Sequence, residues 1–248
     1  MLIYEIIKKI QEFCPENTAE EWDNPGIQIG NIYGSTENVY VTLDVTEEAA
    51  DEAVKNKCGL ILSHHPLFFS PFKKIITSEK EGRIIKKLIE NEITVYSAHT
   101  NMDKAARGIN YVLAKKAGIL NPASFTSDEI GLIGDLKDSI CFSDYAKKIS
   151  DILNTHLKIS GDKNKQLKRA AVCSGSGAEY ANAAFLSGAD VLITSDIKYH
   201  QALESKICLI DAGHYPTEIF VKDIFKDILK DTKLNIISSE IKDVFDFI

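Results

Sequence analysis

The stretch Cys58-Gly59-Leu60-Ile61-Leu62-Ser63-His64-His65-Pro66 decides how this chain is organised. Its apolar centre, 60–62, is continuous and not alternating, as expected for a short strand buried on both faces of a parallel sheet. Two imidazoles follow where the strand ends, and Pro66 disfavours a continued strand ladder. In open α/β sheets, binding and catalytic residues gather at the carboxyl ends of the strands. A bare His-His pair is equally compatible with packed, hydrogen-bonded side chains, so its meaning depends on what else reaches that edge.

Strands and helices are predicted to alternate through the first half of the chain. A helix over 2–13 ends before Pro15, whose ring disfavours helical continuation. Further strands are predicted at 27–30, 39–43, 60–62 and 93–97, and further helices at 47–56 and 78–91. This alternation indicates largely parallel sheets that are covered by helices on both faces.

The second half repeats this order of elements. Residues 188–196 parallel 58–64, and residues 206–214 parallel 92–99. We infer an internal duplication that produces two related three-layer α/β/α domains with mostly parallel or mixed sheets. A join near 121–127 gives predicted domains of 1–125 and 126–248. Whether the C-terminal segment 232–248 returns to the first domain stays open.

Composition narrows the class of protein. Hydrophobic residues make up 44% and charged residues 26% of the 248 residues, as in ordinary soluble globular proteins. No apolar run approaches the length of a membrane span, and the N-terminal pattern is an amphipathic helix and not a signal peptide, so we expect a cytoplasmic protein without a membrane partner. The five cysteines include no CxxC pair, which favours buried reduced thiols. A net charge of −7 counts against nucleic-acid binding by the chain as a whole.

Side chains that bind metals follow strands in both halves. The first half contributes His64, His65, His99 and Asp103, and the second contributes His214 and Glu218. Histidine and carboxylate in similar numbers, without thiolate, are the donors that zinc, manganese, iron or nickel use in hydrolytic sites. If Pro216 lies in the first turn of a helix, His214 and Glu218 can face one point. Because a carboxylate can bridge two cations, such a set suffices for a two-metal site.

Five motifs in the chain carry a specific resemblance to a known family. In chain order they are Glu20-Glu21-Trp22-Asp23-Asn24-Pro25-Gly26, Ser63-His64-His65-Pro66, Ala98-His99-Thr100-Asn101-Met102-Asp103, Ser195-Asp196-Ile197-Lys198-Tyr199-His200 and Asp211-Ala212-Gly213-His214-Tyr215-Pro216-Thr217-Glu218. They resemble the motifs of the GTP cyclohydrolase I type 2 homologue family, also described as dinuclear-metal-centre hexameric proteins and related to the yeast NGG-one-interacting factor. The resemblance covers essentially the whole chain and implies two α/β/α domains, a toroidal homohexamer and a two-metal site that faces its cavity.

The resemblance also implies roles for individual residues. The metal ligands that it implies, with the glutamate as the bridge, are His64, His65, Asp103, His214 and Glu218. It implies that His99 and His200 orient ligands or contact the substrate as catalytic candidates. Pro216 departs from the family pattern, in which a small residue is commoner there, and the chain resembles the short form that lacks an inserted domain.

Other interpretations of the same residues remain open. Asp103 could instead be the N-cap of a helix that begins near Lys104, because Asp is a preferred cap. His99 could simply orient Asp103 or another ligand. The loop 174–177, Ser-Gly-Ser-Gly, could bind an anion through its backbone amides, although helix capping is the simpler interpretation.

Two functions follow from these expectations. The first is a metal-dependent hydrolase that uses two divalent ions (zinc, iron, manganese or nickel) on a small nucleotide-like or phosphorylated substrate, with His99 or His200 moving a proton. The GTP cyclohydrolase activity itself is implied by the family's name alone. The alternative is a non-catalytic hexameric protein that binds or delivers metal, or acts as an interaction scaffold. A closed ligand shell would favour the alternative, because catalytic metal sites keep one position open.

Overall fold

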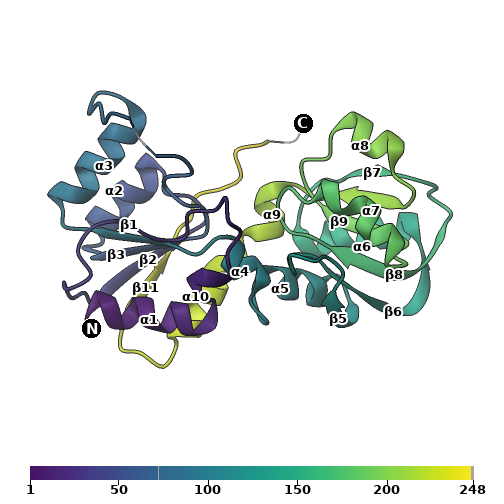
Figure 1. Ribbon diagram of the computed structural model, residues 1–248, viewed down its shortest axis with the longest axis horizontal. Helices are drawn as coiled ribbons and strands as arrows, with labels where there is room; N and C mark the ends of the chain where they lie inside the picture. The colour runs from purple at the N-terminus through teal and green to yellow at the C-terminus, as the bar shows by residue number, and fades with distance from the viewer. Residues whose placement is uncertain (72, 247–248) are drawn as a thin grey trace. The chain divides into compact units, whose positions relative to one another are not determined.

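The chain forms two compact units in the computed structural model, which describes residues 1–71 and 73–246 (Figure 1). The first unit comprises Met1–Ala105 and Val221–Lys242, and the second comprises Ala106–Phe220 together with the chain from Asp243. This partition differs from the division at residues 125 and 126 that the sequence indicates. Phe247 and Ile248, which belong to the C-terminal segment that the sequence left open, lie outside the described residues.

The sheet of the first unit has the strand order β1-β4-β3-β2-β11. Its strands are β1 (Gly26–Ile29), β2 (Asn38–Thr42), β3 (Leu60–Ser63), β4 (Thr94–Ser97) and β11 (Asn235–Ser238). The four strands β4, β3, β2 and β11 are parallel, whereas β1 pairs with β4 in the antiparallel direction. The C-terminal strand β11 therefore completes the sheet of the first unit.

Helices cover both faces of this sheet (Figure 1). The helices are α1 (Ile3–Phe13), α2 (Glu47–Lys55), α3 (Lys80–Glu90), the short α4 (Thr100–Lys104), α10 (Val221–Leu229) and the 3₁₀ turn η1 (Glu16–Thr18). On one face, Ala53 of α2 and Leu88 of α3 pack against Ile61 and Val95 of the central strands. On the other face, α10 contacts α1 and β2. The continuous apolar run at 60–62 is explained by burial on both sides, because all three residues are fully buried.

The second unit has a mixed sheet with the order β5-β6-β8-β9-β10-β7. Its strands are β5 (Ile119–Ser124), β6 (Leu132–Cys141), β7 (Lys158–Ser160), β8 (Gln166–Val172), β9 (Val191–Thr194) and β10 (Cys208–Asp211). The pairs β8–β9 and β9–β10 are parallel, whereas β5–β6, β6–β8 and β10–β7 are antiparallel. The predicted join at 121–127 is not a linker but overlaps the edge strand β5. Asn121 and Pro122 lie there at a break in register between Leu120 and Ala123, where a proline can be accommodated in an edge strand.

Helices cover both faces of the second sheet as well. They are α5 (Ile109–Lys116), α6 (Phe142–Leu153), α7 (Ala181–Leu186), α8 (Tyr199–Glu204), α9 (His214–Glu218) and the 3₁₀ turn η2 (Ala178–Tyr180). Leu113 of α5 and Tyr145 of α6 share one core cluster with Ile193 of β9. Ala184 of α7 lies in a separate cluster with Leu192, the residue of β9 that precedes Ile193. Alternate residues of the strand thus face two helical layers.

The two sheets share one arrangement, which supports the inferred duplication. The order β1-β4-β3-β2 matches β7-β10-β9-β8, since each begins with an antiparallel edge strand that is followed by three parallel strands. The helix that follows each repeat in the chain belongs to the other compact unit. Helix α5 follows the first repeat but packs on β5, β6 and β8 of the second unit, and α10 follows the second repeat but packs in the first unit. This exchange is why a boundary drawn from the sequence repeat does not coincide with the compact units.

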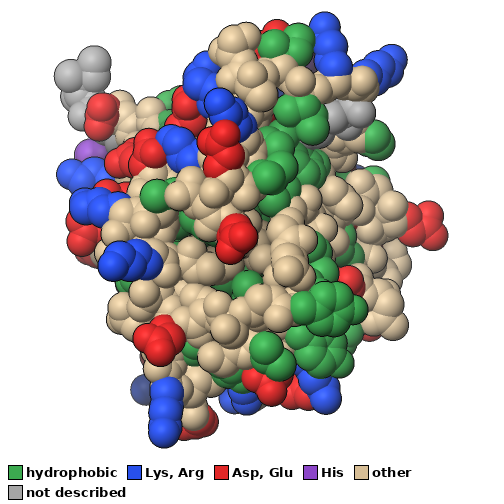
Figure 2. All heavy atoms as spheres, turned by 90° about the vertical axis from the view of Figure 1, so that its left-hand side faces the viewer, with side chains coloured by type: hydrophobic (Ala, Val, Ile, Leu, Met, Phe, Trp, Pro, Cys, Tyr) green, Lys and Arg blue, Asp and Glu red, His purple; other side chains and the backbone are tan. Residues whose placement is uncertain are grey.

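The burial of the cysteines and the mixture of charges on the surface agree with what the composition indicates. All five cysteines lie in the described part of the chain and none of them forms a disulfide there; four are buried and Cys141 is partly accessible. Lys and Arg side chains lie interspersed with Asp and Glu on the face shown in Figure 2. None of the helices within residues 1–71 and 73–246 combines the length and the hydrophobicity that crossing a bilayer requires.

Candidate metal centre

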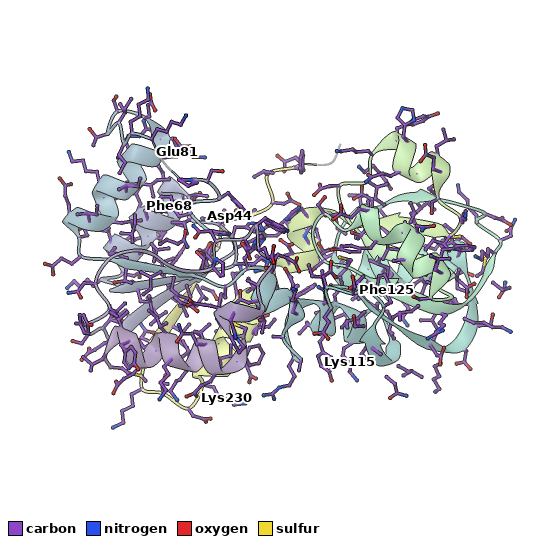
Figure 3. All side chains as sticks on the ribbon, in the orientation of Figure 1. Asp44, Phe68, Glu81, Lys115, Phe125 and Lys230 are labelled. Carbon is purple, nitrogen blue, oxygen red and sulfur yellow. The ribbon has the colours of Figure 1, made fainter. Side chains whose placement is uncertain are left out.

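Three neighbouring strands of the first unit end in register. Thr42 of β2 lies opposite Ser63 of β3, which in turn lies opposite Ser97 of β4. The hydroxyl groups of Ser63 and Ser97 are 2.8 Å apart and join two of these strand ends. The side chains that come directly after the aligned ends are therefore delivered to one edge of the sheet. These side chains are Asp44 (labelled in Figure 3), His64, His65 and His99.

The three imidazoles form a compact cluster. One nitrogen atom from each of His64, His65 and His99 can be chosen such that all three lie within 4.8 Å of one another. The ring centroids are 5.1 Å apart for His64 and His65, and 5.0 Å apart for His64 and His99. The structure thus brings together the residues that the sequence predicted from two separate motifs.

Each ring of the cluster is held through Nδ1 by an oxygen atom. The partners of Nδ1 are Ala98 O for His64 (2.8 Å), Asp44 Oδ1 for His65 (2.7 Å) and Asp23 Oδ1 for His99 (2.8 Å). A carbonyl or an ionised carboxylate only accepts hydrogen bonds, so Nδ1 carries the proton and Nε2 is the nitrogen suited to a metal. Metal-binding histidines in proteins are oriented in this way.

Asp103 lies beside this cluster and is not a helix cap. Helix α4 begins at Thr100 with His99 as its N-cap, and the Asp103 N–H donates to the His99 carbonyl at 3.1 Å. The interpretation of Asp103 as an N-cap is therefore wrong. Its side chain is mostly buried, and Oδ2 lies 3.8 Å from His64 Nε2, which is too long for a hydrogen bond. Asp103 thus adds a carboxylate donor next to the imidazoles.

Asp23 holds His99 and the following residue, Thr100, through hydrogen bonds. Its Oδ1 accepts from His99 Nδ1, and its Oδ2 accepts from the backbone N–H (3.0 Å) and the hydroxyl (2.6 Å) of Thr100. Burial alone would raise the pKa of Asp23, but the hydrogen bonds from His99 and Thr100 and the charge of His99 outweigh it and lower the pKa to about 2. Asp23 is therefore ionised at neutral pH and orients the His99 ring.

The second unit carries a smaller group of imidazole and carboxylate side chains. His214 and Glu218 stand one turn apart on α9, directly after β10, with Pro216 in the first turn where a missing N–H is tolerated. His214 Nε2 lies 3.0 Å from Glu218 Oε2, so the two side chains face one point, as the sequence indicated. His214 Nδ1 is held by Asp196 Oδ2 at 2.7 Å.

The loop at Gly175 lies against this pair. A Cβ atom at Gly175 would be 2.2 Å from Glu218 Oε1 and 3.3 Å from His214 Nε2, and the residue has a φ of +58°. Only glycine fits at this position without displacing the glutamate. The neighbouring amides are engaged by side chains: Gly175 N–H donates to Thr217 and Gly177 N–H donates to Thr194. These bonds do not support the interpretation of 174–177 as an anion-binding loop.

His200 is not part of either group. It is exposed on α8, with Tyr199 as its ring neighbour at 5.3 Å. Its role in catalysis stays a prediction. Asp44 and Asp196, which hold His65 and His214, were not among the residues predicted for the site. The available signal was position, because each follows a strand end within two residues.

Known proteins resemble the chain over its full length. The family model described as Duf34/NIF3 (NGG1p interacting factor 3) matches residues 1–244. The chain belongs to the Duf34/NIF3 family. A protein named "GTP cyclohydrolase 1 type 2 homolog" from Clostridium perfringens is 34% identical over 262 residues, and the match covers 100% of both chains. The family predicted from the five motifs is thereby confirmed.

Solved structures confirm the α/β fold of this Duf34/NIF3 chain. A hypothetical protein from Staphylococcus aureus superposes with a TM-score of 0.92 at 28% identity, covering 100% of this chain and 99% of that chain. Reduced HcgD from Methanocaldococcus jannaschii superposes with a TM-score of 0.87 at 29% identity, covering 97% and 98%.

The donor atoms of the Duf34/NIF3 chain fit a divalent cation. The first unit offers three imidazoles with oriented Nε2 atoms and a mostly buried carboxylate. The second unit offers an imidazole and a carboxylate at contact distance. Nitrogen and oxygen donors of this kind are compatible with metal binding by zinc, iron, manganese or nickel.

Proposed function

We propose that this Duf34/NIF3 protein binds two divalent metal ions and hydrolyses a small nucleotide-like or phosphorylated substrate. The observation that carries the proposal is the cluster of His64, His65 and His99, whose nitrogen atoms lie within 4.8 Å of one another. The proposed ligands, with the glutamate as the bridge, are His64, His65, Asp103, His214 and Glu218. The proposed ions are zinc, iron, manganese or nickel.

The chain's own residues have distinct roles in this proposal. Divalent ions polarise substrate oxygens and lower the pKa of water that they bind. Asp44 and Asp196 orient the ligands His65 and His214 through their Nδ1 atoms. His99 exchanges a proton with the substrate at Nε2, while Asp23 orients its ring through Nδ1. His200 is the second candidate for proton transfer.

The proposal includes an assembly and a compartment. We expect a toroidal homohexamer that works in the cytoplasm. Five cysteines without a disulfide among the described residues are compatible with a reducing compartment. Native mass spectrometry of the purified chain tests the assembly, since a mass of six chains is expected and a monomer would contradict it.

Elemental analysis tests the metal sites. The chain is purified without chelator, and metals per chain are measured for wild type, His65→Ala and Glu218→Ala, with His156→Ala as a control at an exposed histidine. About two ions per chain are expected in the wild type and the control, with sharp losses in the two ligand variants. Wild-type metal content in His65→Ala and Glu218→Ala would contradict the ligand assignment.

A substrate panel then tests the chemistry. The metal-loaded protein is incubated with nucleotides, nucleosides and simple phosphoesters, and the products are resolved by chromatography. Hydrolysis that disappears with chelator and returns with metal is expected. A metal-loaded protein that is inert towards the whole panel would favour the alternative function of metal binding or delivery.

A further inference from the structure

A cavity of about 340 Å³ lies in the first unit beside the imidazole cluster. It is lined by residues 22–24, from the turn before β1, and by residues 68–71, from the loop after β3. Figure 3 labels Phe68 in this loop. Ligand pockets span roughly 300–1,000 Å³, so this cavity suits one ring system and not a large ligand.

Two aromatic walls of the cavity connect it to the cluster. The Trp22 ring centroid lies 6.0 Å from that of His99, and the Phe69 centroid lies 5.4 Å from it, both in edge-on geometry. Trp22 is 62% exposed and Phe69 is 54% exposed. Two exposed aromatic side chains that border one cavity form an apolar patch, and patches of this kind mark ligand-binding grooves more often than singly exposed residues do.

Hydrogen bonds hold the two walls of the cavity together before any ligand binds. Asn24 Nδ2 donates to the Phe68 carbonyl at 2.6 Å, and the Phe68 N–H donates to Gln28 Oε1 at 3.2 Å. Gln28 Nε2 in turn donates to the Asn24 carbonyl at 2.8 Å. The cavity is therefore preorganised, which lowers the entropic cost of binding.

The polar atoms of the lining specify the chemistry of the ligand. The described residues of the lining include no Lys or Arg, and the carboxylate among them, Asp23, already accepts hydrogen bonds from His99 and Thr100. A free phosphate group would thus find no counter-charge in the lining. Within the described residues the hydrogen bonds of Asn24 use its N–H, its carbonyl and Nδ2 but not Oδ1, and Ser70 also belongs to the lining, so the lining offers an acceptor and a hydroxyl group to a polar ring edge.

We infer that the cavity between Trp22 and Phe69 binds a planar heteroaromatic ring of nucleobase size and selects nucleobase-containing substrates. Aromatic faces stack on any nucleobase, and a hydrogen-bonding edge distinguishes a heterocycle from a purely apolar ring. The ring packs next to His99, while the charged parts of the substrate lie outside the cavity. The catalytic meaning of this site rests on the proposed function, but ring binding itself does not.

Trp22 is the single tryptophan of the chain and lies in the cavity wall, so tryptophan fluorescence reports directly on binding in the cavity. The chelator-treated full-length protein is titrated with adenosine, guanosine and cytidine, and with ribose 5-phosphate as a ligand that has the sugar but no heteroaromatic base. Tryptophan fluorescence and equilibrium dialysis measure binding. Saturable quenching by at least one nucleoside, and none by ribose 5-phosphate, is expected.

Variants assign the binding to the cavity. Phe69→Ala is expected to weaken nucleoside binding about tenfold or more, since it removes one stacking face. Trp22→Ala, measured by dialysis, is expected to do the same, while Trp22→Phe retains binding. Tyr33→Ala removes an aromatic ring that is 82% exposed and outside the lining, and should leave binding unchanged.

The outcomes separate this inference from the proposed function. Absence of saturable binding for every nucleoside, equal binding of ribose 5-phosphate, or unchanged binding in Phe69→Ala would each overturn the inference. Ring binding by a chain that takes up no metal would refute the proposed function and support the inference. Metal uptake and hydrolysis without ring binding would overturn the inference alone.

Discussion

The Nδ1 atom of His65 lies 2.7 Å from Oδ1 of Asp44, so the loop after β2 orients a ring on the loop after β3. The second unit repeats this relationship, because His214 Nδ1 lies 2.7 Å from Asp196 Oδ2. A carboxylate in this position fixes the tautomer of the imidazole and increases the basicity of its other nitrogen. Two of the three predicted metal-binding histidines, His65 and His214, are thus oriented by a carboxylate that follows a neighbouring strand.

Asp44→Asn should weaken metal binding without unfolding the chain. The amide keeps the size of the side chain but loses the charge that supports His65, and such partners typically contribute about 10–100-fold to metal affinity. The Asp44 side chain is 53% exposed, so little stability is at stake. Calorimetric metal titration measures the effect, with Asp51→Asn, an exposed carboxylate that pairs with Lys87, as the control. Equal affinity in the two variants would contradict the role of Asp44.

Gly175→Ala should remove metal by displacing Glu218. The added Cβ would approach Glu218 Oε1 to 2.2 Å, and the left-handed φ of +58° adds a strain of about 1–2 kcal/mol for a non-glycine residue. Gly188→Ala is the matched control, because it has a φ of +84° and meets only Arg169 Nη1, at 3.4 Å.

Both glycine variants are therefore expected to lose similar free energy of unfolding, measured with urea. Only Gly175→Ala should lose bound metal, measured by elemental analysis. Equal metal content in the two variants would show that the position of Glu218 does not depend on this glycine.

Asp23→Asn should destabilise the protein in a way that depends on pH. The folded pKa of about 2 lies below the usual 3.8, so folding favours the ionised form. The resulting stabilisation is complete above pH 3.8 and is lost as the pH falls towards 2; a pKa difference of this size corresponds to about 2 kcal/mol.

The measurement is urea unfolding of both proteins by circular dichroism. The free energy of unfolding of wild type should exceed that of Asp23→Asn by about 2 kcal/mol at neutral pH, and the gap should narrow in acid below the unfolded pKa. A difference that is constant across this range would mean that the loss reflects packing and not the ionised carboxylate.

A chain that ends at Phe220 should fail to fold its first unit. The truncation removes α10, whose Val221 and Phe225 are fully buried, and β11, which pairs with β2. A chain that ends at Lys242 is the control, since it removes Phe245, which is 69% exposed. Circular dichroism and urea unfolding measure the effect. A native unfolding transition of full amplitude in the shorter chain would contradict the helix exchange.

Local patterns in the sequence predicted most strands that carry the site. The buried run at 60–62 and the strand before His99 appear as β3 and β4, and their C-terminal ends deliver the histidines. The hairpin of β5 and β6 was missed, because Asn121-Pro122 has the composition of a turn, and its acceptance at a sheet edge depends on pairing with β6.

The sequence by itself determined the class of fold, the repeat and the candidate donor side chains, because apolar runs and the residues that follow them are properties of neighbouring positions. Only the tertiary structure decided which carboxylate holds which ring, that α5 and α10 are exchanged between the units, and that Trp22 and Phe69 border one cavity. These features join residues far apart in the chain through strand register and loop packing. A local pattern carries no record of such pairings, since each half of a pair is compatible with many partners until the sheet forms.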